Sequence, residues 1–169
     1  MGPLAVRVLG VDPGAAATGY GVVEREGGTC RLVECGVIRP ARPDALAERL
    51  RRIHEELLGV IDRLEPDCLA VEGVFHGENV RSAVVLAHAR GAVLLAGSLR
   101  GLEVAEYPPA EIKKAVVGTG RATKEQVGYM VQKLLHLAEP PRPADAADGC
   151  AAALCHLHVS RPALRSGTA

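Results

Sequence analysis

The chain has 169 residues, 48% of them hydrophobic and 24% charged, a composition typical of a globular protein large enough to bury its own core. Lys plus Arg and Asp plus Glu both number 20, so the formal net charge is zero and the total does not indicate the strongly basic surface of many nucleic-acid-binding proteins. No secretory segment opens the chain, and the longest apolar stretch, residues 83–99, is interrupted by His88 and Arg90. We expect a soluble cytoplasmic protein with one domain over residues 1–160 and a flexible tail over 161–169.

The first forty residues are expected to form an antiparallel meander. Strands are predicted over 4–12, 18–26 and 29–40. The turn PGAAATG ends the first strand, and Gly27-Gly28, a dipeptide common in hairpins, separates the other two. The chain therefore builds three neighbouring strands before its first helix.

Helices and strands alternate in the rest of the chain. Apolar residues at steps of three and four predict a helix over 43–67, with Asp44 as its N-cap and Pro66 as its stop. Thr123 and Gln126 are expected to form a capping box. The other elements are a strand at 68–75, an apolar helix at 79–101, a strand at 102–108, a short helix ending near 117, and helices over 124–138 and about 145–159. This order predicts an α/β fold: a mixed five-stranded sheet, three antiparallel strands and then two parallel ones, flanked by helices.

Two carboxylates are placed at or near the ends of predicted strands. Asp12 ends the first strand before Pro13-Gly14, where an aspartate can also cap a turn through its own backbone. Glu72 is the single charged residue in the apolar segment CLAVEGVF, and it would be costly to bury ionised without a partner. A structural ion pair with an arginine is the alternative explanation for Glu72.

Asp145 and Asp148 lie three residues apart in the segment PRPADAADGC, so they share one face of the last predicted helix. Acidic residues also suit the first turn of a helix because of the helix dipole, and either aspartate alone is explained in that way. If the strands of Asp12 and Glu72 are neighbours and the last helix begins beside them, four carboxylates converge. Such a group repels itself unless cations bind. Oxygen ligands suit Mg²⁺ or Mn²⁺, and two such ions support phosphoryl displacement.

Five segments that occur in order resemble the RuvC family of Holliday-junction resolvases. They are GVDPGAAATGYGVV, VEGVF, ARGA, VVGTGRATKEQV and ADAADGCAAALCH, and the match runs from about Leu4 to Ser160. The resemblance implies an RNase H-like fold and a homodimer that nicks two opposing strands of a four-way DNA junction, using two Mg²⁺ or Mn²⁺ ions per active site. It assigns the catalytic and metal-binding roles to Asp12, Glu72, Asp145 and Asp148. Some members of the family have histidine in place of Asp145.

The same resemblance leads to expectations about products and partners. Hydrolysis with two metal ions would leave 5′-phosphate and 3′-hydroxyl ends, which are nicks that can be ligated. The family also works with a branch-migration motor complex. Both are implications of the resemblance.

The segment after Glu72 contains candidate DNA contacts. Phe75, the only phenylalanine of the chain, is either an ordinary core residue or, as the resemblance implies, a loop aromatic that stacks on a base near the crossover. Asn79 and Arg81 follow as weaker candidates, and His76 could approach DNA beside Phe75.

Four basic residues gather around the loop VVGTGRA and the helix after it. They are Lys113, Lys114, Arg121 and Lys124. Such a cluster is commonly a solvated face, but the resemblance assigns contacts with backbone phosphates to Lys113 and Lys124. If the residues of this cluster bind phosphates, each loss weakens binding to every sequence and reduces its salt dependence.

Three other classes of protein share part of this pattern. Sugar-kinase and actin-like ATPases also begin with a strand, an aspartate and a glycine turn, but they need a second lobe for which 169 residues leave little room. The segment GTGRATK lacks the spacing of a nucleotide-binding phosphate loop. A YqgF-type nuclease acting on RNA is a closer alternative, which ADAAD with VEGVF disfavours, and a non-catalytic DNA-binding or scaffold subunit would not need all four acids.

Two features of the helices have more than one explanation. Gly149 follows Asp148 inside the last predicted helix, where glycine costs about 1 kcal/mol relative to alanine. It either allows close approach of the strand that carries Glu72 or loosens the helix near the site. The helix at 79–101 is apolar around most of its circumference, so it is either buried or covered by a partner, which gives a physical reason for a dimer.

Overall fold

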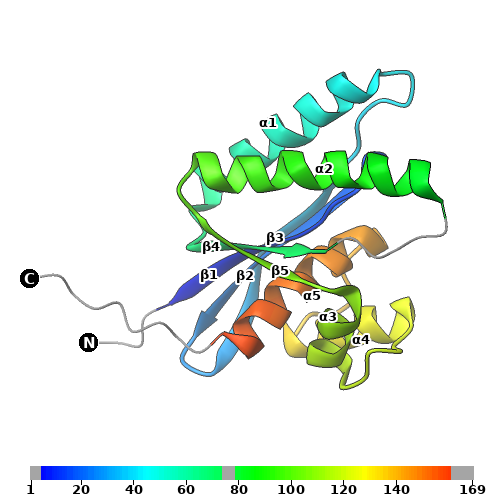
Figure 1. Ribbon diagram of the computed structural model, residues 1–169. Helices are drawn as coiled ribbons and strands as arrows, with labels where there is room; N and C mark the ends of the chain where they lie inside the picture. Colours follow the sequence, from blue (N-terminus) through cyan, green and yellow to red (C-terminus); the bar gives the residue numbers. More distant parts are fainter. Residues whose placement is uncertain (1–4, 74–78, 161–169) are drawn as a thin grey trace, which may run out of the picture.

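The computed structural model describes residues 5–73 and 79–160. Its centre is a five-stranded sheet with the strand order β3-β2-β1-β4-β5, which lies between two layers of helices (Figure 1). Phe75, His76 and the predicted tail at 161–169 lie outside the described residues.

The strands have the predicted directions. The first three form an antiparallel meander, and the last two add parallel strands beside β1. The strands are β1 (Val6–Asp12), β2 (Thr18–Glu26), β3 (Thr29–Ile38), β4 (Cys68–Glu72) and β5 (Glu103–Tyr107). The mixed five-stranded sheet expected from the sequence is confirmed.

Each face of the sheet is covered by its own group of helices. α1 (Leu46–Leu64) and α2 (Val80–Leu99) pack on one face. α5 (Ala144–Val159) packs on the other, with α3 (Pro109–Val117) and α4 (Lys124–Leu134) against it (Figure 1). Because successive strand residues point to opposite faces, the apolar runs of the central strands fill both layers.

Side chains of β1 illustrate this division of the core. Val8 packs with the α5 layer, whereas Leu9 and Val11 pack with α1 and α2, and all three are fully buried. All five cysteines are free thiols, and the three buried ones lie in the core on the α5 side of the sheet.

Several helix ends differ from the sequence prediction. α1 begins after Ala45, whose side chain cannot cap, so the predicted N-cap Asp44 lies one residue before the cap position, and its amide donates to the carbonyl of Ala41. α1 ends at Leu64 rather than at 67, because Glu65 adopts a left-handed conformation with φ 46°.

The N-termini of two other helices are capped by side chains. The Thr123–Gln126 capping box at the start of α4 is confirmed, with both of its reciprocal hydrogen bonds present. The Asn79 side chain accepts a hydrogen bond from the Ser82 amide at 3.2 Å and caps α2. Asn79 therefore has a structural role in addition to its candidate role in DNA binding.

Glycines bring α5 into backbone contact with the sheet. A Cβ atom at Gly10 would lie 2.1 Å from the carbonyl oxygen of Gly149, and one at Gly19 would lie 1.8 Å from that of Asp145. A Cβ atom at Gly149 would lie 2.5 Å from the backbone of Tyr20 in β2. Gly149 thus serves close approach, but the expectation that it faces the strand of Glu72 is wrong, because α5 lies over β1 and β2.

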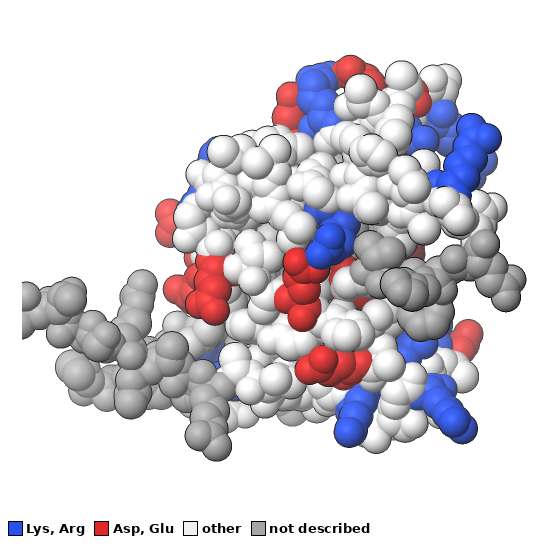
Figure 2. Space-filling view, viewed as in Figure 1, with Lys and Arg blue, Asp and Glu red and all other residues white. Residues whose placement is uncertain are grey.

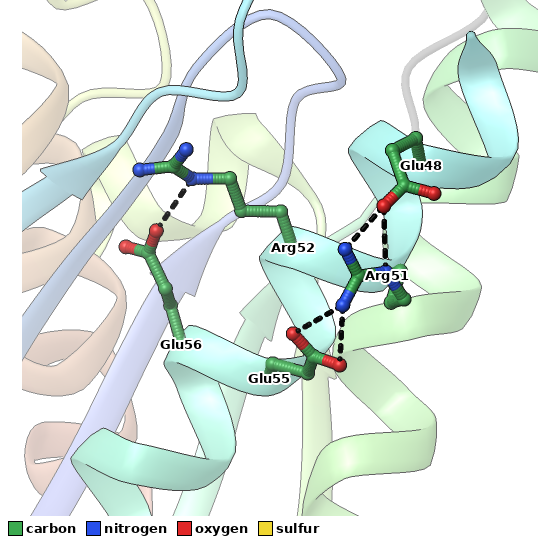
Figure 3. A network of polar contacts seen from close by, with 5 residues as sticks. All are labelled: Glu48, Arg51, Arg52, Glu55 and Glu56. Atoms are coloured by element: carbon green, nitrogen blue, oxygen red, sulfur yellow. Dashed lines mark hydrogen bonds and ion pairs between the residues drawn. The ribbon is translucent and has the colours of Figure 1, made fainter. Parts of the chain in front are cut away.

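The outer face of α1 is charged and solvated. Arg51 pairs with Glu48 and Glu55, and Arg52 Nε donates to Glu56 at 2.7 Å (Figure 3). Ion pairs between neighbouring turns of an exposed helix contribute little to stability. An exposed arginine of this face, such as Arg52, is therefore a suitable control for the substitution of an arginine elsewhere.

The outer face of α2 is apolar instead. By length and composition α2 could cross a membrane, but its inner face packs on α1 and the sheet, with Ala89 and Val93 fully buried. The surface over α2 is almost free of charged side chains (Figure 2). The apolar stripe that we define on this face consists of Val80, Val84, Leu95 and Leu99, which are 77%, 49%, 53% and 57% exposed.

Candidate active site

Three elements end or begin at one edge of the sheet. β1 and β4 are parallel neighbours in which Val11 pairs with Val71, so Asp12 and Glu72 end adjacent strands side by side. The first two turns of α5 carry Asp145 and Asp148 to the same place. The predicted convergence of the acids follows from this topology.

The acids form a compact group. Asp12, Asp145 and Asp148 each offer a carboxylate oxygen, and these three atoms lie within 4.8 Å of one another. Glu72 lies beside Asp12, because the two residues end neighbouring parallel strands and line the same hollow. Three oxygens at this spacing are suitable ligands for a divalent cation.

The pKa values of three of the acids are raised, chiefly by burial. Burial, followed by the charge of Asp148, raises the pKa of Asp12 to about 6. Burial and the charges of Asp12 and Asp148 raise the pKa of Glu72 to about 8. Burial also raises the pKa of Asp148. Burial and neighbouring negative charge thus favour the protonated form of Glu72, and a bound cation would offset that charge.

Two basic side chains contact the acids of α5. Lys124 Nζ lies 3.2 Å from Asp148 Oδ2, and Arg39 Nη2 lies 3.3 Å from Asp145 Oδ2. The negative charge of Asp148 raises the pKa of Lys124. Both basic side chains are more than half exposed, at 68% and 56%, so each is a weakly held partner.

A hollow of about 220 Å³ opens beside the acids. It is lined by Asp12, Glu72 and Asp148, by the basic residues Lys113 and Lys124, and by Pro109, Ile112, Val127 and Ala151. Carboxylates suited to binding a cation and ammonium groups suited to binding phosphate thus share one concave surface.

The other candidate DNA contacts lie farther from the acids. Lys114 and Arg121 are exposed near the hollow but do not line it within the described part of the chain. Arg81 is exposed on the first turn of α2. Basic side chains project from the region of α3 and α4 (Figure 2).

Sequence reasoning missed two arginines. Arg90 of α2 lines a second hollow, of about 110 Å³, together with Asp12 and Glu72, and it pairs with Glu106. Arg39 contacts Asp145. A signal for Arg39 was present, because β3 runs in the same direction as β1 and therefore ends at the same edge of the sheet.

Comparisons with known proteins agree with the geometry. The family model described as crossover junction endodeoxyribonuclease RuvC matches residues 8–156. The chain belongs to the RuvC family. A crossover junction endodeoxyribonuclease RuvC from Pelotomaculum thermopropionicum is 48% identical over 151 residues, which cover 89% of this chain and 92% of the relative.

Solved RuvC structures have the same fold. The Thermus thermophilus RuvC structure is 38% identical, with a TM-score of 0.82 and coverage of 92% of this chain and 94% of that one. The T. thermophilus RuvC in complex with a Holliday junction substrate gives a TM-score of 0.85 at 38% identity, covering 90% of this chain and 93% of that one. The predicted RNase H-like class and RuvC family are confirmed, and the ATPase and YqgF alternatives are disfavoured.

The pKa of Glu72 predicts how the stability of this RuvC family member depends on pH without metal. Between the ordinary pKa of 4.5 and the folded pKa of about 8, the folded protein binds more protons than the unfolded chain, so stability falls as the pH rises. We expect Glu72→Gln, which cannot ionise, to raise the free energy of unfolding by about 1–3 kcal/mol at pH 8.5 and hardly at all at pH 5. Urea denaturation in EDTA measures both values.

The control for this experiment is Glu26→Gln, since Glu26 is exposed at the end of β2. It should change stability equally little at both pH values. If Glu72→Gln changed the free energy of unfolding equally at pH 5 and pH 8.5, ionisation of Glu72 would not be what destabilises the folded protein.

Proposed function

We propose that this protein is a metal-dependent endonuclease that resolves four-way DNA junctions by symmetric nicks in two opposing strands. The observation that carries the proposal is the convergence of Asp12, Asp145 and Asp148, with Glu72 beside Asp12, in a chain of the RuvC family. The T. thermophilus relative bound to a Holliday junction supports this class of substrate.

Mg²⁺ or Mn²⁺, two ions per site, fits the donor set. All four side chains offer oxygen, the ligand that these ions prefer, and the raised pKa values of Asp12, Glu72 and Asp148 reflect burial and neighbouring negative charge that a cation would offset. Asp12, Glu72, Asp145 and Asp148 would hold the ions. Bound divalent cations supply a nucleophilic water at neutral pH and offset the charge on the attacking and leaving oxygens. The resulting ends are a 5′-phosphate and a 3′-hydroxyl.

The basic residues of the hollow hold the substrate. Lys113 and Lys124 attract backbone phosphates and keep the cleaved strand over the acids. Lys114, Arg121 and Arg81 extend this positive surface outward. Stacking of Phe75 on a base stays a prediction from the resemblance.

Paired nicks need two active sites, and the apolar stripe of α2 offers a surface for a second copy. Its four residues lie on one side of α2 by helical spacing, one pair near each end of the helix. We infer a homodimer through this face. A branch-migration motor complex as partner and a cytoplasmic location stay predictions.

We expect the double variant Leu95→Glu/Leu99→Glu to be monomeric, because two charges would be buried without partners in a dimer interface. Light scattering after size-exclusion chromatography measures the change, and the apparent dissociation constant should rise at least about tenfold. Tyr129→Glu is the matched control, since Tyr129 is 55% exposed on α4. Equal dissociation constants of the dimer in both variants would show that this face is not the dimer interface.

A labelled synthetic four-way junction tests the function. In Mg²⁺ or Mn²⁺ the protein should place symmetric nicks in two opposing strands, and a ligase should seal them. EDTA should abolish cutting, and a linear duplex of the same sequence should be a poor substrate. Absence of metal-dependent cutting would refute the proposal.

A further inference from the structure

Arg39 occupies a particular place beside the acids. β3 and β1 are both antiparallel to β2, so β3 ends at the same edge as β1, and Arg39 directly follows its last residue, Ile38. Arg39 Nη2 lies 3.3 Å from Asp145 Oδ2. This is the one hydrogen bond of the Arg39 side chain among the described residues.

The lysines of the hollow approach the acids from a different direction. Lys113 and Lys124 come from α3 and α4, which pack against α5. Asp145 instead lies over Gly19 of β2, whose partner in β3 is Val37. Arg39 thus stands on the β3 side of the acid group, and the lysines stand on the side of α3 and α4.

We propose that Arg39 binds a backbone phosphate of the cleaved DNA strand on the β3 side of the acids. The inference rests on the proposed function, because it requires a nucleic-acid strand that crosses the acid group. Such a strand carries a phosphate at every nucleotide, and the lysines supply positive charge to one side of the crossing only.

The chemistry of Arg39 suits this role. Its pairing with Asp145 is a single contact between side chains that are 56% and 33% exposed, and exposed ion pairs are weakly held. Divalent cations on the carboxylates would offset the charge of Asp145 and would leave the guanidinium group of Arg39 available for another anion. Its planar array of N–H donors matches two oxygens of one phosphate.

The alternative is that Arg39 only orients Asp145. The two roles predict different measurements. A phosphate contact changes the affinity for the junction and the dependence of that affinity on salt. An orienting role changes the affinity for divalent cations, which can be measured on the protein alone.

The experiment compares Arg39→Gln with Arg52→Gln, an exposed arginine of α1 that also pairs with one acid (Figure 3). Junction affinity is measured by fluorescence anisotropy in Ca²⁺ over a series of salt concentrations, with uncut junction verified on a denaturing gel. Mn²⁺ affinity is measured by calorimetry without DNA. Arg39→Lys tests whether charge alone is enough.

We expect Arg39→Gln to weaken junction binding about 3- to 10-fold and to lower the slope of log affinity against log salt by about one, with Mn²⁺ affinity preserved. Arg39→Lys should retain most of the slope, and Arg52→Gln should match the wild type. Equal affinity and slope in the two glutamine variants would overturn the proposal. So would a loss of Mn²⁺ affinity with unchanged junction binding. If the proposed function itself is wrong, the wild-type protein fails to cut the junction whatever residue stands at position 39.

Discussion

Asp12→Asn should lower the rate of junction cleavage by about 10³-fold or more, beyond the 10- to 100-fold loss typical of residues that only orient metal ligands. Asp12 links the two parts of the group, because it belongs to the set of three oxygens and also ends the strand next to that of Glu72. Asparagine has the same shape but removes one negative charge, so cations bind more weakly and less accurately. Single-turnover cleavage of a labelled junction in Mg²⁺ and in Mn²⁺ measures the loss.

Junction binding should be almost unchanged in the same variant. Removal of a negative charge does not weaken attraction for phosphates, and the lysines of the hollow are untouched. Anisotropy in EDTA should therefore give an affinity within about threefold of the wild type. Asp62→Asn is the control, since Asp62 is an exposed residue of α1 that pairs with Arg100. Cleavage by Asp12→Asn within tenfold of that control would remove Asp12 from the catalytic group.

Gly149→Ala should lower the free energy of unfolding by about 3 kcal/mol or more, the upper end of the cost of overpacking. The added Cβ atom would meet the Tyr20 backbone at 2.5 Å, and backbone in a central strand cannot move aside as a flexible side chain can. The helix would have to lift away from the sheet, carrying Asp148 with it. Urea denaturation and junction cleavage should therefore both report the damage.

Gly59→Ala is the matched control, because it makes the same change inside α1. A Cβ atom at Gly59 meets nothing within 4 Å. This variant should gain about 0.5–1 kcal/mol from the better helix propensity of alanine. If Gly149→Ala were as stable as Gly59→Ala, the close approach of α5 to β2 would be wrong.

The fold could be predicted where local chemistry decides it. The Thr123–Gln126 capping box depends on residues three apart, and it forms as expected. Asp44 shows the limit of such reasoning, since it looks like an N-cap but lies one residue before the cap position of α1. The partner strand of Gly149 depends on how α5 crosses the sheet, which no local pattern encodes.

The same distinction applies to the site. Asp12 and Glu72 stand out because an acid at the end of an apolar strand needs an explanation, and the resemblance assigns their roles together with those of Asp145 and Asp148. Arg39 does not stand out in the same way, because an exposed arginine at the end of a strand needs no special explanation. The predicted meander already places the end of β3 at the edge where β1 ends, but the contact of Arg39 with Asp145 follows only from the docking of α5.

The docking of α5 has a consequence for biosynthesis. Residues 144–159 leave the ribosome after every strand of the sheet, yet they supply two of the four acids. Asp12 and Asp148 are separated by most of the chain, so the group closes through one of the longest-range contacts in the molecule. Such contacts form late in folding because chain entropy opposes them. A nascent or partly folded chain consequently lacks the assembled acid group, and the capacity to cut DNA arises only with the finished fold.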